Sequence, residues 1–188
     1  MLNDPQRKQL LTLARESIAA VFAGKRPELV ADTFDADLRR RAGAFVTLTQ
    51  NEELRGCIGS IEPVAPLYLA VSQSAVNAAF RDPRFDPLRS EELQGIHIEI
   101  SVMGPIERVV DVDDISVGRD GLIIRRGGYA GLLLPQVATE YGWDRETFLQ
   151  QTCYKAGLPR NSWREAATTI EKFAAEVFGE KEVIARAG

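Results

Sequence analysis

The most regular pattern in the chain is the alternation of apolar and polar residues from Ile96 to Met103. Side chains of an extended strand point alternately to its two faces, so this alternation predicts a strand with one buried face. Two β-rich runs, at 44–49 and 54–61, lie on either side of the polar residues 50–53. They predict a hairpin, because a short polar turn between two strand-like runs is typical of one.

A second hairpin is predicted further along the chain. The runs 122–126 and 129–134 flank the pair Gly127-Gly128, and paired glycines suit the positive backbone angles of a two-residue hairpin turn. The segment 168–178 is less regular, because its apolar residues fit one helical face although it opens with β-branched residues. The spacing alone gives a slight preference for a helix there.

Helical spacing of apolar residues marks the other regular segments. The first predicted helix has Asp4 as its cap and Pro5 in its first turn, and it ends before Gly24. The other predicted helices show similar start and stop signals, and they cover 66–80, a short stretch near 90–94, 135–142 and 144–157. Helices mixed with hairpins, without a repeated strand-helix-strand unit, predict an α+β fold with a mainly antiparallel sheet packed by helices.

Length and composition are those of one soluble domain. The 188 residues, of which 45% are hydrophobic, can bury one core or the cores of a larger and a smaller lobe, so we treat residues 1–188 as a single domain. The N-terminus lacks a basic segment followed by a long apolar one, and no apolar run is long enough to cross a membrane. We therefore expect a soluble, cytoplasmic protein.

The charge pattern argues against a nucleic-acid-binding surface. Acidic residues outnumber basic ones, 27 to 23, and the two signs are interspersed, whereas nucleic-acid-binding domains usually carry a net basic face. The two cysteines are too few for a disulfide framework or a four-ligand zinc site. They fit a reducing compartment, and the sequence predicts no metal site and no cofactor.

The candidate chemistry gathers in the hexapeptide at 54–59. On a regular strand Arg55 and Cys57 share one face, while Leu54 and Ile58 point to the other. A neighbouring cation favours the reactive thiolate form of a cysteine. At the spacing of two strand residues, Arg55 alone activates the thiol only in part.

A catalytic use of Cys57 needs a base as well. The only histidine in the sequence is His97, on the polar face of the alternating strand. Cys57 with His97 as base and an acidic residue is therefore the sole protease-like set available. The sequence equally permits Cys57 as a half-buried strand residue and His97 as an ordinary exposed one, and nothing in it places the two side chains together.

A binding role for the same stretch depends on its glycines. Glycine in a strand marks a bulge or the close approach of a ligand to the backbone. Arg55 beside exposed N–H groups near Gly56 and Gly59 suits a carboxylate or a phosphate, and a purely structural bend explains the glycines equally well. Arg84, in the proline-rich turn 82–88, either projects into a cleft or forms a salt bridge within the turn, which is the favoured interpretation.

Six blocks of the sequence resemble the AMMECR-one domain family, whose bacterial and archaeal members are called protein A of the AmmeMemoRadiSam system. The blocks follow one another along nearly the whole chain: LRGCIG at 54–59, DPRFDPL at 82–88, IEISV at 98–102, GRDGLII at 118–124, LLPQVA at 133–138 and KAGL at 155–158.

The resemblance implies an α+β domain with a larger and a smaller lobe, in which the segment 168–178 is a strand. The family motif Arg-Gly-Cys-Ile-Gly matches residues 55–59 without departure. Family members are encoded beside a Memo-type protein and a radical S-adenosylmethionine enzyme, which implies a shared pathway. The resemblance brings no established activity with it.

Two functions of different class follow from these observations. The first, which we favour, is a binding or accessory module that presents the strip 55–59, with Arg84 and His97 at its rim, to a small anionic molecule or to an acidic group of one of the two pathway partners. The alternative is a cysteine-dependent enzyme, with Cys57 as nucleophile and His97 as base for acyl or other group transfer.

Overall fold

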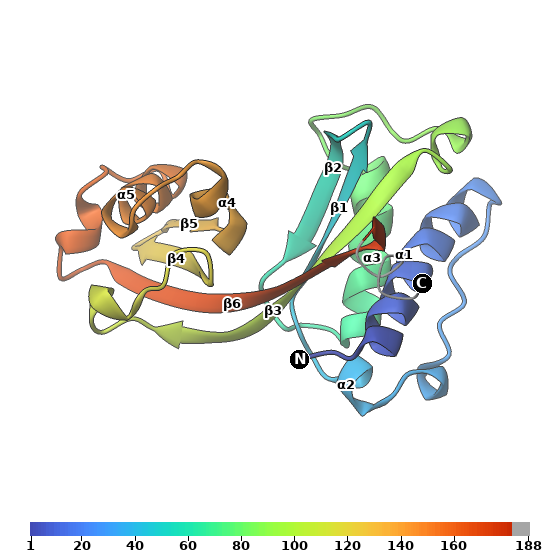
Figure 1. The fold of residues 1–188 in the computed structure, drawn as a ribbon, viewed down its shortest axis with the longest axis horizontal. Helices are drawn as coiled ribbons and strands as arrows, with labels where there is room; N and C mark the ends of the chain where they lie inside the picture. Colours follow the sequence, from blue (N-terminus) through green and yellow to red (C-terminus); the bar gives the residue numbers. More distant parts are fainter. Residues whose placement is uncertain (182–188) are drawn as a thin grey trace. The chain divides into compact units, whose positions relative to one another are not determined.

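Figure 1 shows the fold in a computed structural model, which describes residues 1–181 of the chain. Helices and strands are mixed along the sequence, as an α+β fold requires, so the predicted class is confirmed. The elements are α1 (Asp4–Phe22), α2 (Ala36–Arg39), β1 (Ala44–Gln50), β2 (Glu53–Ser60), α3 (Leu67–Phe80), β3 (Ile96–Arg108), β4 (Asp120–Arg126), β5 (Tyr129–Leu133), α4 (Pro135–Glu140), α5 (Arg145–Lys155) and β6 (Thr169–Gly179).

The six strands form one sheet in the order β2-β1-β3-β6-β4-β5. The pairs β1–β2, β1–β3, β4–β5 and β4–β6 are all antiparallel. Strand β2, which carries the motif at 55–59, therefore lies at one edge of the sheet. Within residues 1–181 no helix combines the length and the apolar character needed to cross a bilayer.

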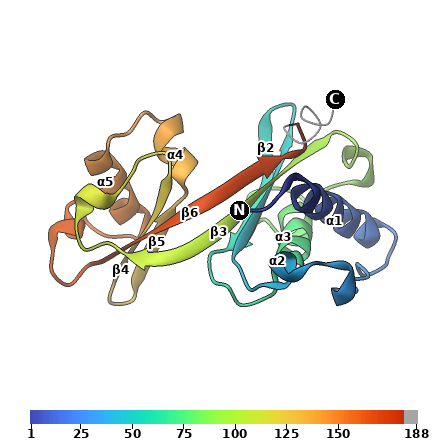
Figure 2. The same cartoon turned by 60° about the horizontal axis from the view of Figure 1, so that its bottom comes forward.

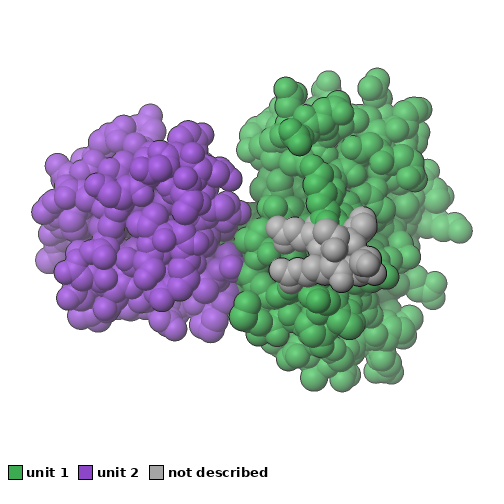
Figure 3. Space-filling model, viewed as in Figure 1, with its two compact units in different colours: residues 1–103, 176–188 green, residues 104–175 purple. Residues whose placement is uncertain are grey.

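The chain divides into two compact units, which Figure 3 colours separately. Unit 1 comprises residues 1–103 and the C-terminal segment from Glu176, and unit 2 comprises residues 104–175. Strands β3 and β6 each begin in one unit and end in the other. Each unit has a hydrophobic core of its own.

Unit 1 buries one face of its strands beneath α1 and α3, which lie side by side in Figure 2. Val46 and Leu48 of β1 and Ile98 and Ile100 of β3 are fully buried on this face. Burial of each such side chain stabilises the fold by about 1.5 to 3 kcal/mol. The alternation that predicted the strand at 96–103 thus records which side chains enter the core.

Unit 2 packs α4 and α5 against the hairpin of β4 and β5. Phe148 and Cys153 of α5 are fully buried in its core. Burial raises the pKa of the Cys153 thiol, as expected for an unreactive core cysteine. The helix approaches β5 so closely that a Cβ added at Gly131 would lie 2.3 Å from the backbone nitrogen of Ala156.

The predicted helices and hairpins are confirmed, with small differences at their ends. Helix α1 is capped by Asn3 rather than by Asp4. The Asn3 side chain accepts a hydrogen bond from the backbone nitrogen of Gln6 at 2.9 Å, and the Gln6 side chain accepts one from the backbone of Asn3 at 2.8 Å. This reciprocal arrangement is a capping box, so the cap is one residue earlier than the proline suggested.

The slight preference for a helix over 168–178 is wrong, because residues 169–179 form strand β6. This strand lies between β3 and β4 in the sheet, and its residues 169–174 pair with β4. A helix at this place would leave backbone donors and acceptors of both neighbouring strands unpaired. Pairing with distant strands therefore overrides the helical spacing, and the strand implied by the family resemblance is present.

Candidate functional site at the edge of strand β2

The motif strand is not regular, because a bulge interrupts its pairing with β1. The register passes from Leu48 opposite Gly56 to Thr49 opposite Leu54, which leaves Arg55 as the extra residue. A bulge of this kind re-aims the side chain that it carries. Arg55 consequently leaves the regular alternation of the strand.

The expected distribution of the motif over two faces is wrong at one residue. Cys57 pairs with Thr47 and Leu54 pairs with Thr49, and residues 47 and 49 lie on the same face of β1. Directly paired residues of neighbouring strands share a face, so Leu54 lies on the face of Cys57 and not opposite to it. Ile58 packs against the core on the other face, as predicted.

Arg55 fastens the segment 82–92 to strand β2. Its Nε donates to Oε1 of Glu92 at 2.9 Å and its Nη2 donates to Oε2 at 3.2 Å, while Nη1 donates to the carbonyl of Asp86 at 2.9 Å. The hydrogen bonds from Arg55 lower the pKa of Glu92 to about 2. The two side chains are only 16% and 11% exposed, so Arg55 is an internally paired residue.

Asp82 and Arg84 close the free edge of β2 beside Cys57. Asp82 Oδ2 accepts a hydrogen bond from the backbone nitrogen of Cys57 at 2.9 Å, and Arg84 Nη2 donates to the carbonyl of Cys57 at 3.2 Å. The two side chains also pair with each other at 2.7 and 2.9 Å, so the favoured turn salt bridge of Arg84 is present. They occupy the backbone positions that a further strand would use.

The Asp82 carboxylate is ionised under ordinary conditions although it is buried. Hydrogen bonds from Arg84 hold the pKa of Asp82 well below its usual range, against the opposing effect of burial. The same contact raises the pKa of Arg84. Because Asp82 is buried, loss of Arg84 would leave its carboxylate without its main partner, so the two side chains stabilise the edge as a unit.

The two motif glycines are explained by close backbone packing. A Cβ added at Gly56 would lie 2.2 Å from the carbonyl oxygen of Ala78 in α3, and one added at Gly59 would lie 2.3 Å from that of Ala44 in β1. Neither position has room for a side chain. The backbone N–H of Cys57 between them is already taken by Asp82. The geometry thus favours the structural interpretation of the glycines.

The Cys57 thiol is half-buried on the sheet face that carries Thr47. The hydroxyl of Thr47 donates to Cys57 Sγ at 3.3 Å. Cys57 is half-buried whereas Cys153 is buried, so Cys57 is the more accessible of the two cysteines. Among the hydrogen bonds described, only Cys57 of the two receives one from a hydroxyl group.

His97 lies two strands away from Cys57, because it pairs with Thr49 of β1 while Cys57 is on the other side of that strand. Two strand spacings place their backbones roughly 10 Å apart or more. The His97 Nε2 accepts a hydrogen bond from the backbone nitrogen of Lys181 at 3.1 Å, and Nδ1 lies 3.6 Å from the Glu180 carboxylate. Burial lowers the pKa of His97, and Glu180 offsets this in part. The structure does not bring the two side chains together.

Sequence reasoning missed three residues that complete the site, namely Thr47, Asp82 and Glu92. The Asp-Pro-Arg triplet that begins at Asp82 signals a turn, but not that its carboxylate reaches the edge of a sheet. No spacing links Glu92 to Arg55, because the bulge creates that contact. Within the described part of the chain, no three His, Cys, Asp or Glu side chains cluster as a metal site.

These observations define the class of protein: an α+β protein of two compact units, built on a six-stranded antiparallel sheet whose edge strand carries a cysteine and is closed by arginine–carboxylate pairs. The model of the AMMECR1 family matches residues 11–178. The chain belongs to the AMMECR1 family.

Similar proteins support this assignment over nearly the full length. The chain is 44% identical to a protein of Methanothermobacter thermautotrophicus, over 95% of this chain and 96% of that one. It is 42% identical to Protein PF1979 of Pyrococcus furiosus, over 96% and 90%. The crystal structure of uncharacterized protein PH0010 from Pyrococcus horikoshii is similar with a TM-score of 0.89 at 42% identity, and the match covers 96% of this chain and 94% of that one. The family resemblance is confirmed, and these names state no activity.

Proposed function

We propose that the chain is a binding module that docks an anionic group of a partner or of a small molecule at the edge of β2. The docking surface, termed the β2 ledge, consists of Arg55, Asp82, Arg84, Arg89 and Glu92 and lies beside Cys57. One observation carries the proposal: the Arg84 side chain is 54% exposed although its Nε and Nη2 are bonded internally. Among residues 1–181, no hydrogen bond uses its Nη1, so this nitrogen can donate to a carboxylate or phosphate.

Arg89 supplies a second exposed cation near the first. Its side chain is 79% exposed, and its Nε lies 3.5 Å from Oε2 of Glu92. Arg84 is bonded to the backbone of Cys57. Arg89 lies beside Glu92, which is bonded to Arg55. The two exposed arginines are therefore linked to positions 57 and 55 of β2, which are two residues apart. Two exposed guanidinium groups beside the same edge strand suit an anionic partner group.

Recognition at the β2 ledge depends on geometry more than on bulk charge. Four arginines and four carboxylates are present at residue 55 and over residues 81–92, namely Arg55, Arg81, Arg84, Arg89, Asp82, Asp86, Glu91 and Glu92. Without a net positive charge, the affinity should fall only moderately with salt concentration, through screening of the exposed Arg84 and Arg89. A nucleic-acid-binding surface behaves differently, because counterion release makes its affinity fall steeply with salt.

The partner that we propose is the Memo-type protein or the radical S-adenosylmethionine enzyme that accompanies this family, with the encounter in the cytoplasm. Membership of the AMMECR1 family supports this choice, because the family resemblance is the source of both candidates. Internal pairing of Arg55 and Asp82 supports a docking role as well. A surface whose supporting groups are already fixed loses little conformational entropy on binding.

One contact favours a second function, that of a cysteine-dependent enzyme with Cys57 as nucleophile. The Thr47 hydroxyl donates to Cys57 Sγ and so holds the half-buried thiol in a fixed position. In this function His97 is not positioned as the base, because its ring nitrogens face Glu180 and Lys181. The base would have to come from the substrate or from a partner.

Co-purification separates the two functions. The tagged chain is co-expressed with the Memo-type protein and the radical enzyme of the same genome, as wild type and as Arg89→Glu, Arg40→Glu and Cys57→Ala. Arg40 is an exposed arginine away from the β2 ledge, so its variant controls for the charge change. We expect wild type, Arg40→Glu and Cys57→Ala to retain a partner and Arg89→Glu to lose most of it.

Two results would count against the binding module. If wild type retains neither protein, or if Arg89→Glu behaves like Arg40→Glu, the β2 ledge does not dock these partners. If Cys57→Ala alone releases the partner, the thiol is part of the recognition or the chemistry, and the second function gains support.

A further inference from the structure

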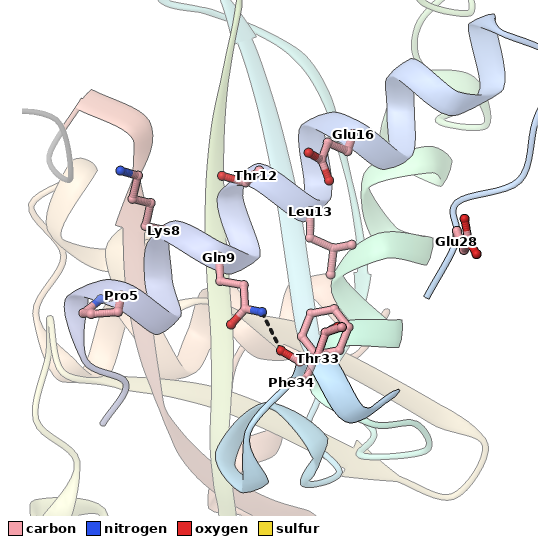
Figure 4. Close-up of a pocket in the computed structure, with 9 residues that line it drawn as sticks. All are labelled: Pro5, Lys8, Gln9, Thr12, Leu13, Glu16, Glu28, Thr33 and Phe34. Atoms are coloured by element: carbon pink, nitrogen blue, oxygen red, sulfur yellow. Dashed lines mark hydrogen bonds between the residues drawn. The ribbon is translucent and has the colours of Figure 1, made fainter. Parts of the chain in front are cut away.

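A cavity of about 440 Å³ lies in unit 1 between helix α1 and the segment 28–34 (Figure 4). Its lining residues on α1, from Pro5 to Glu16, recur every three or four positions and so form one face of the helix. The volume falls within the range of small-molecule sites. We term it the α1 cavity, and it shares no residue with the β2 ledge.

The floor of the α1 cavity is apolar and its wall is held in place. Leu13 and Phe34 form the floor, and they are only 8% and 7% exposed. The ring of Phe34 stacks on Tyr68 with a centroid distance of 4.3 Å. The Gln9 side chain donates to the carbonyl of Thr33 at 3.0 Å, which ties the segment to the helix, as Figure 4 shows. The site is therefore largely preformed.

Three charged side chains surround this floor without internal partners. Among the residues described, Lys8, Glu16 and Glu28 form no ion pair and no side-chain hydrogen bond, although all three line the cavity. Other charged residues of the same helix do pair, since Arg7 is bonded to Glu176 and Arg15 to Glu180. On helix α1, the charged residues without such partners in the described part of the chain are therefore those that line the cavity.

We infer that the α1 cavity binds a short peptide with free ends. The peptide ammonium meets the carboxylates of Glu16 and Glu28, a central apolar side chain lies on Leu13 and Phe34, and the terminal carboxylate meets Lys8. An ammonium and a carboxylate at opposite ends, with an apolar part between them, are the complement of the charges and the floor.

The spacing sets the length of the peptide. Lys8 and Glu16 are eight positions apart on one helix, which corresponds to about 12 Å along its axis. An extended tripeptide spans roughly 10 Å, which is close to this length. A tripeptide with a central leucine therefore fits both charged ends and the apolar floor.

Calorimetric titration of the full chain with the tripeptide Ala-Leu-Ala tests the inference. The probe is used with free ends, with an acetylated N-terminus and with an amidated C-terminus. For the free peptide we expect a Kd of about 0.1 mM, as is usual for a ligand of this size. Each blocked end should raise the Kd about threefold to fivefold, the range that exposed ion pairs reach.

Matched variants assign each end to its residue. In the double variant Glu16→Gln/Glu28→Gln, acetylation should have no further effect, and in Lys8→Gln amidation should have none, because the partner group is already gone. Lys25→Gln, an exposed lysine beyond the cavity lining, should bind all three peptides like wild type. All replaced side chains are exposed, so the unfolding temperature should stay unchanged and report intact folding.

The inference is overturned by any of three results. The first is no measurable binding of the free peptide at about 1 mM, which corresponds to a weak binding free energy of about 4 kcal/mol. The second is equal affinity for the free and the blocked peptides. The third is an effect of blocking one end that persists in the variant lacking the matching charge. None of these results touches the β2 ledge, because the two surfaces have no residue in common.

Discussion

The β2 ledge and the α1 cavity belong to the same unit, yet they treat their charged residues in opposite ways. In the β2 ledge Arg55 and Arg84 are bonded to carboxylates and to backbone carbonyls of the chain itself. In the α1 cavity Lys8, Glu16 and Glu28 have no such partners among the described residues. One surface is a clamp with a narrow exposed rim, and the other, which we propose as a receptor, is open and carries these unpaired charges.

The difference teaches that a conspicuous motif need not be the part of a protein that meets the ligand. Arg55 and the motif glycines hold the segment 82–92 and helix α3 in place. What remains for recognition is the Nη1 of Arg84 and the side chain of Arg89. Stability should therefore respond to the paired residues, and binding should respond to the exposed ones.

The largest effect is expected for Gly56→Ala. The added Cβ would lie 2.2 Å from the backbone oxygen of Ala78, so helix α3 must move. We expect a loss of about 3 kcal/mol in the free energy of unfolding, at the upper end for overpacking. Gly128→Ala is the control, since nothing lies within 4 Å of its added Cβ. Urea denaturation measures both, and equal changes would show that the motif glycine is not a packing requirement.

Next in size is the loss of the Arg55–Glu92 pair. Glu92→Gln removes a charge that accepts two hydrogen bonds from Arg55, which should cost about 1 to 3 kcal/mol of unfolding free energy. Glu28→Gln makes the same chemical change in the α1 cavity and should alter stability by less than about 0.5 kcal/mol. If the two variants lose the same amount in urea denaturation, the contrast between clamp and receptor fails.

The same pair predicts how stability depends on pH. The pKa of Glu92 falls from an ordinary 4.5 to about 2 in the folded protein, so as the pH decreases the unfolded chain binds its proton first. The stabilisation is complete above about pH 5 and is lost as the pH falls towards 2. Unfolding free energies measured between pH 6 and pH 3 should therefore decline less in Glu92→Gln than in wild type. Parallel curves would mean that the Glu92 carboxylate is not held by Arg55.

Local patterns made much of the fold predictable. The strand at 96–103 follows from its alternation, and the turn between β4 and β5 follows from Gly127, whose φ is +56°. Strand β6 could not be assigned from its own residues, because its structure depends on β4 and β3, which lie far away in the sequence. Non-local pairing leaves no periodic trace when a strand is irregularly buried.

The candidate site was predictable only in part. Arg55 and Cys57 stand out by residue type, and the salt bridge of Arg84 follows from the Asp-Pro-Arg turn. The bulge, the contact with Glu92 and the distance to His97 depend on strand register, which the sequence does not display. The α1 cavity gave no signal either, because its lining is the ordinary polar face of an amphipathic helix.

The most direct test of the binding role is the affinity of the purified partner for wild type, Arg89→Glu and Arg40→Glu at low and at physiological salt. We expect Arg89→Glu to bind about fivefold to tenfold more weakly, since Arg89 is an exposed cation at the rim of the docking surface. Wild type and Arg40→Glu should bind alike, and their affinity should fall only moderately with salt. Equal affinities for Arg89→Glu and Arg40→Glu, or a steep fall with salt for wild type, would contradict docking at the β2 ledge.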